Sequence, residues 1–112
     1  MPLDGEVERV MDAFHDDRAF LWCGDCLELL AVGVCADTFD SVVTDAPYEL
    51  NFMKKSWDRS GVAFRAETWA EILRVLKPGG HLVAFGGSRT SHRMVCAIED
   101  AGFEIRDSIQ WL

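Results

Sequence analysis

One short segment places two acceptor groups beside an aromatic ring. In TDAPY, residues 44–48, the carboxylate of Asp45 and the backbone carbonyl of Ala46 come just before Tyr48. Pro47 restricts Ala46 to extended conformations and so limits the direction of its carbonyl. Two acceptors next to an aromatic face suit a planar ring that carries an amino group. The same residues are also compatible with an ordinary Asp-x-Pro turn beside a core tyrosine.

A second segment, WCGDC at residues 22–26, has the spacing of a dithiol redox site. Cys23 and Cys26 are separated by two residues and come directly before a helical pattern. A reactive thiolate needs positive surroundings, whereas the charge of Asp25 opposes it. Gly24 and Asp25 alternatively form a strand-end turn in which Asp25 caps the next helix. A dithiol oxidoreductase therefore remains an alternative, with incidental cysteines as the other interpretation.

Helices and strands alternate along the chain. Hydrophobic periodicity and turn residues predict helices at residues 4–14, 26–34, 69–76 and 91–101, strands at 20–22, 41–44, 81–85 and 103–112, and a long loop at 49–65. The sequence KPGG is expected to form a sharp turn, and HLVAF, which follows it, a buried strand. This order indicates an α/β fold with a mostly parallel sheet and helices on both faces. Ligands in such sheets bind at the carboxyl ends of the strands. Three segments come directly after predicted strands here: GDC, DAPY and GGSRT.

Length and charge indicate the number of domains and the kind of partner that the chain could bind. A chain of 112 residues with 49% hydrophobic residues predicts one domain, and its sequence contains no signal peptide or membrane span. We therefore expect a cytoplasmic protein with reduced thiols. The net charge is −8, but residues 54–93 hold eight Lys or Arg against three Asp or Glu. This basic stretch is either a solvated surface or a face that touches a polyanion.

The run DSVVTDAPYELNFMKKSWD, residues 40–58, resembles the catalytic region of DNA amino-methyltransferases that act on adenine N6 or cytosine N4. The motif of that family is Asp/Asn/Ser-Pro-Pro followed by an aromatic residue. Residues 69–94 and 98–112 resemble the same family, in the permuted order in which this motif precedes the cofactor glycine loop. Ala46 replaces the first proline but still supplies a backbone carbonyl, and Glu49 replaces a glycine that is common after the aromatic residue.

The resemblance implies a Rossmann-like fold that binds S-adenosylmethionine and DNA without a metal. It assigns residues 45–48 (Asp45, Ala46, Pro47 and Tyr48) to the target base, which is flipped out of the duplex. Gly24 and Asp25 would lie near the cofactor. The resemblance and the charge pattern together place phosphate contacts at Lys54, Lys55, Arg59 and Arg89.

The resemblance covers residues 20–112, after a leader helix within residues 1–18. No Phe-x-Gly-x-Gly loop, which cradles the cofactor in the family, occurs in the sequence. We therefore expect an N-terminal fragment of a restriction–modification enzyme, truncated at its C-terminus and with little activity alone. Its sheet would have a gap between the strands near residues 21 and 43. A non-catalytic DNA-binding module, favoured by Ala46, is the other alternative, and the choice between adenine and cytosine, the recognition sequence and the oligomeric state stay open.

Overall fold

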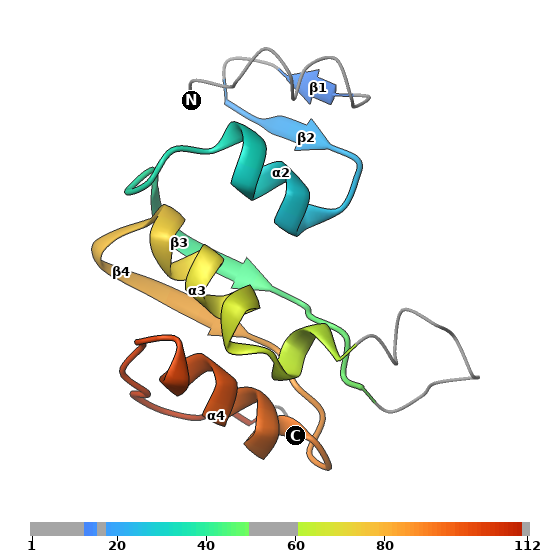
Figure 1. Cartoon of the computed structure of the whole chain (residues 1–112), viewed down its shortest axis with the longest axis vertical. Helices are drawn as coiled ribbons and strands as arrows, with labels where there is room; N and C mark the ends of the chain where they lie inside the picture. The colour runs from blue at the N-terminus through green and yellow to red at the C-terminus, as the bar shows by residue number, and fades with distance from the viewer. Residues whose placement is uncertain (1–12, 16–17, 50–60, 111–112) are drawn as a thin grey trace.

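The computed structural model describes residues 13–15, 18–49 and 61–110 (Figure 1). Its strands are β1 (Ala13–His15), β2 (Phe20–Trp22), β3 (Phe39–Thr44) and β4 (Leu76–Ala84). Its helices are α2 (Cys26–Gly33), α3 (Ala66–Val75), α4 (Ser91–Asp100) and the 3-10 helix η3 (Val62–Phe64). Helices and strands alternate, which confirms the predicted α/β class. None of the helices within these ranges is long and apolar enough to cross a membrane.

β3 and β4 form a parallel pair. Thr44 lies opposite Ala84, and the amide of Phe85 donates to the Thr44 carbonyl at 3.0 Å, which extends the pairing by one residue. Parallel strands need a crossover, which η3 and α3 provide here. Both strands therefore end at the same edge of the sheet.

The start of β4 is irregular. The expected turn at KPGG lies within this strand, where the register shifts between Phe39 and Ser41 of β3. Gly79 has φ 81°, and a Cβ on Gly80 would lie 2.9 Å from the Asp40 carbonyl oxygen. The glycine pair is therefore needed both for the left-handed backbone and for the close approach of the two strands.

The core lies on one face of this pair. Its buried side chains come mainly from α3 and α4 and include Trp69, Ile72, Met94 and Ile98. On the opposite face Val43 is 67% exposed, and Val83 and Phe85 are each 47% exposed. The predictions of helices on both faces and of a buried HLVAF strand are therefore wrong for the described part of the chain. α3 and α4 pack their apolar stripes on one face only, although the opposite face also carries apolar side chains.

β1 and β2 form a separate antiparallel sheet. The predicted helix over residues 4–14 is wrong at its end, because Ala13 and Phe14 belong to β1. The remainder of that helix lies outside the described residues. β2 does not pair with β3, which agrees with the gap expected between them.

The segment after α4 is neither helix nor strand over residues 103–110. The alternating sequence there predicted a strand, and this prediction is wrong. Alternation supplies one apolar face, but a strand also needs a neighbour for its backbone groups. The predicted end of α4 is confirmed, since Gly102 follows it with φ 116°.

Arg74 joins α2 to α3. Its guanidinium donates to the Leu30 carbonyl at the end of α2 at 2.8 Å and to the Glu71 carboxylate. The hydrogen bond from Arg74 to Glu71 raises the pKa of Arg74. The Leu30 carbonyl also accepts from the Val34 amide, so Arg74 adds a second hydrogen bond there and links α2 to α3.

Two tryptophans allow a matched test of the core. The buried Trp69 indole donates to the Ala63 carbonyl at 2.9 Å, whereas the Trp22 indole nitrogen is buried with no partner in the described structure. Trp69→Phe leaves a buried carbonyl unpaired and should lower the free energy of unfolding by about 1 to 3 kcal/mol. Trp22→Phe is the control and should cost less, because it removes an unpaired donor. Chemical denaturation measures both, and equal losses would contradict the assignment.

Candidate functional site

The segments that follow three of the strands lie on the same side of the molecule. The arrowheads of β2, β3 and β4 point the same way in Figure 1. Residues 23–25, 45–49 and 85–90 follow these strands. These are the segments that the sequence assigned to ligand binding, and the parallel pairing of β3 with β4 brings the last two together.

The acceptor segment, residues 45–48, continues directly from β3. Asp45 is exposed, whereas Ala46, Pro47 and Tyr48 are half-buried. Ala46 packs against the hydrophobic core, which anchors the segment at its middle. A carboxylate that faces solvent beside a partly covered aromatic ring is open to a ligand.

Tyr48 and Asp45 interact with each other. The pKa of the Tyr48 phenol is raised above its ordinary value of 10.0, first by desolvation and then by a hydrogen bond to Asp45 and the negative charge of that carboxylate. The Asp45 carboxylate is therefore close enough to the phenol to disfavour its ionisation.

Thr90 contacts the acceptor segment from the neighbouring loop. Its hydroxyl donates to the Tyr48 carbonyl with an oxygen–oxygen distance of 2.5 Å. Thr90 occupies the N-cap position of α4, but its side chain makes no capping hydrogen bond. The hydroxyl of this N-cap residue is instead used to bind the Tyr48 carbonyl.

Glu49, the residue directly after Tyr48, makes further contacts at the carboxyl end of the segment. Its backbone has φ 59°, a left-handed conformation that is rare outside glycine. Its carboxylate accepts hydrogen bonds from the amide of Gly61 at 3.0 Å and from that of Ala63 at 3.4 Å. The sequence signalled the position only as a glutamate where the resembled family often has glycine.

Gly24 and Asp25 form the turn between β2 and α2. The predicted N-cap is confirmed, since Oδ1 of Asp25 accepts from the amides of Leu27 at 3.0 Å and Glu28 at 3.1 Å. A Cβ on Gly24 would meet only the Leu29 side chain, at the ordinary distances of 3.5 to 3.7 Å. The fold itself therefore does not demand a glycine at this position.

The four residues predicted to contact DNA separate into two groups. Lys54, Lys55 and Arg59 lie outside the described residues. Arg89 is exposed and directly precedes Thr90. The structure thus places one cation in the loop that contacts Tyr48.

The cysteines of WCGDC are free thiols. Cys23 and Cys26 are both exposed. Within the described ranges, no group of three or more His, Cys, Asp or Glu side chains could hold a metal ion.

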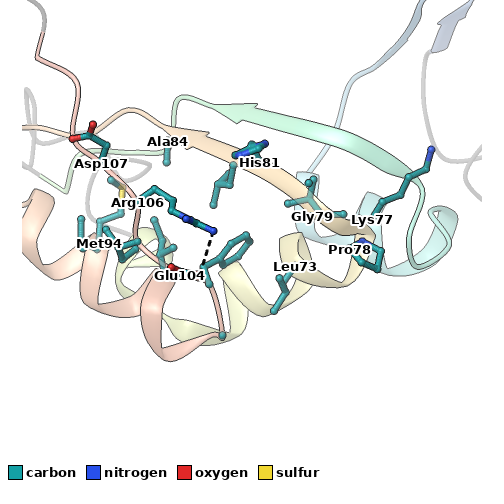
Figure 2. Close-up of a pocket in the computed structure, with 18 of the residues that line it drawn as sticks. Leu73, Lys77, Pro78, Gly79, His81, Ala84, Met94, Glu104, Arg106 and Asp107 are labelled. Carbon is teal, nitrogen blue, oxygen red and sulfur yellow. Dashed lines mark ion pairs between the residues drawn. The ribbon is translucent and has the colours of Figure 1, made fainter.

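A cavity of about 530 Å³ lies elsewhere, along β4 and α4 (Figure 2). His81, Met94 and Arg106 help to line it, and Arg106 forms an ion pair with Glu104 at 3.4 Å. None of residues 45–48 lines this cavity. It is therefore distinct from the strand-end site.

Comparison with known proteins relates the chain to one enzyme class. A family model described as DNA methylase matches residues 39–112. The Type II methyltransferase M.HindIII of Haemophilus influenzae is 41% identical over 46 residues, which are 40% of this chain and 15% of that protein. The matched part of the chain thus spans less than a sixth of its relative's length. No solved structure matches the chain.

The single tyrosine of the chain makes its titration directly observable. Because desolvation and Asp45 both raise the pKa of Tyr48, the phenol should ionise above pH 10 in the folded protein. Asp45→Asn removes the carboxylate charge and should move the pKa part of the way back, leaving the desolvation contribution. Ultraviolet absorbance of phenolate against pH measures both proteins. An unchanged titration in Asp45→Asn would show that the two side chains do not interact.

Proposed function

The chain belongs to the DNA methylase family, and from this premise we propose that it takes part in methylating the exocyclic amine of adenine at N6 or cytosine at N4 in DNA. S-adenosylmethionine is the proposed methyl donor. Because the matched segment is 15% of the relative's length, the activity of a whole enzyme that includes this chain is part of the proposal. So is the assignment of its sheet to a Rossmann-like fold.

The observation that supports this proposal is the acceptor segment at the end of β3. The exocyclic amine of a base is a poor nucleophile, because its lone pair is delocalised into the ring. The exposed carboxylate of Asp45 and the carbonyl of the adjacent Ala46 would accept the two hydrogens of this amine. Such hydrogen bonds orient the amine and favour a pyramidal nitrogen, whose lone pair can then form a bond.

Tyr48 would hold the ring of the base. Its own ring is half-buried, so that one part packs on the protein while another part stays available for stacking. A base inside a duplex can reach this position only after it has been flipped out. With the amine bound, the Asp45 carboxylate is also the acceptor for the proton that the amine loses on methylation.

The turn at Gly24 and Asp25 fits the proposed cofactor. Both capping hydrogen bonds reach Oδ1 of Asp25, so Oδ2 can accept a ribose hydroxyl. Because the packing of the chain does not require Gly24, close approach of a ligand is a physical reason for a glycine there. When bound, S-adenosylmethionine supplies an electrophilic methyl group for the amine.

DNA phosphates would lie around this site. Arg89 is exposed beside Thr90 and can reach solvent at the strand ends. Lys54, Lys55 and Arg59 are proposed as further phosphate contacts on the charge pattern alone.

Asp45→Asn tests the catalytic role in an active enzyme that contains this chain. Loss of the charged acceptor should lower methyl transfer from labelled S-adenosylmethionine about 100-fold or more. Cofactor affinity should stay within about twofold of wild type. Asp100→Asn is the matched control, since Asp100 is exposed at the end of α4, and it should be as active as wild type. Mass spectrometry of the digested DNA identifies the product, and activity retained in Asp45→Asn rejects the role.

Asp25 separates capping from cofactor binding. Asp25→Ser keeps a capping oxygen but removes the carboxylate, so the same enzyme should bind S-adenosylmethionine roughly tenfold more weakly with little loss of stability. Asp25→Ala should lose both affinity and stability. Calorimetric titration and thermal unfolding measure the two effects. Wild-type affinity in Asp25→Ser would leave Asp25 with capping alone.

A further inference from the structure

Two side chains outside the acceptor segment make contacts at its carboxyl end. Thr90 reaches Tyr48 from the loop after β4, and Glu49 reaches Gly61 and Ala63 at the start of η3. These contacts join residues 42, 12 and 14 positions apart along the chain. They act on adjacent residues, because Glu49 directly follows Tyr48.

Each contact departs from the local rule for its residue. The side-chain oxygen of a threonine at a helix N-cap normally accepts from an amide of the first turn, yet the Thr90 hydroxyl donates to the Tyr48 carbonyl and makes no capping bond. A glutamate rarely adopts positive φ, yet Glu49 does so at 59°. Such departures concentrate where a structure serves function instead of local stability.

The Glu49 contact continues into the core. Ala63 donates its amide to Glu49 and accepts the Trp69 indole at its carbonyl. Ala63 and Trp69 are each only 1% exposed. The acceptor segment is therefore connected to the buried core through Ala63.

We propose that Thr90 and Glu49 are positioning residues that hold Tyr48 at the angle at which its ring receives the base. Thr90 fixes the Tyr48 carbonyl, and Glu49 fixes the direction in which the chain leaves Tyr48. Neither side chain touches the reacting atoms. The inference rests on the proposed function for the identity of the ligand, but the contacts themselves do not.

The single tyrosine provides the test. In the full 112-residue chain labelled with carbon-13 at tyrosine, one carbonyl resonance and one ring report on Tyr48. Thr90→Val is nearly isosteric but cannot donate a hydrogen bond, so the Tyr48 carbonyl resonance should move. Thr90→Ser keeps the hydroxyl and should restore the wild-type resonance. An unchanged carbonyl resonance in Thr90→Val would overturn the proposal for Thr90.

Glu49→Gly distinguishes the carboxylate contact from backbone strain. Glycine accepts φ 59° without cost, so a purely conformational role predicts an undisturbed Tyr48. The proposed role predicts that the Tyr48 ring signal moves or broadens, because the links to Gly61 and Ala63 are lost. Glu49→Gln keeps one oxygen acceptor and should give an intermediate result. Wild-type spectra for Glu49→Gly would overturn the proposal for Glu49.

Deoxyadenosine and deoxycytidine monophosphates, added to the same labelled proteins, test the consequence for the base. The shift of the Tyr48 ring signal, followed against nucleotide concentration, gives the affinity for each nucleotide. Because Thr90→Val loses one orienting hydrogen bond, its affinity should be about fivefold weaker than that of wild type. Thr90→Ser keeps the hydroxyl, and its affinity should stay within about twofold of wild type. Equal affinities in Thr90→Val and wild type would overturn the positioning role. If wild type itself binds neither nucleotide, the proposed function fails at this segment, and the carbonyl resonances still decide whether the two contacts hold Tyr48.

Discussion

The parallel pairing of β3 with β4 is the constraint on which the rest of the structure depends. Parallel strands cannot be joined by a tight turn, so the chain must cross over, and the crossover places α3 on one face of the pair. The same pairing brings both carboxyl ends to one edge. The acceptor segment and the loop that carries Thr90 are neighbours for this reason, although 42 residues separate Tyr48 from Thr90.

The core and the site share one buried residue. Ala63 fills the space beside Trp69 and uses both of its backbone groups, one toward the Trp69 indole and one toward Glu49. Buried backbone groups must find partners, and here both partners are side chains from other segments of the chain. Ala63 thereby links the buried Trp69 of α3 to Glu49, the residue that follows Tyr48.

Local signals allowed several features to be predicted from the sequence. Asp25 caps α2, Gly102 ends α4, and the strand before Asp45 ends at Thr44 as expected. Each depends on a few adjacent residues. The contacts of Thr90 and Glu49 could not be predicted, because their partners lie far along the chain. The alternation in residues 103–110 predicted a strand, but alternation does not supply a neighbouring strand.

The bond between Thr90 and Tyr48 also orders the events of folding. A contact across 42 residues can form only after the crossover has closed, and closing a loop of that length costs chain entropy before any contact repays it. The segment that follows β3 carries Asp45 and Tyr48, but before the crossover closes it lacks the contact with Thr90. A nascent or partly unfolded chain therefore contains the residues of the site but not their folded arrangement. The site is completed late, when Thr90 at the start of α4 reaches Tyr48.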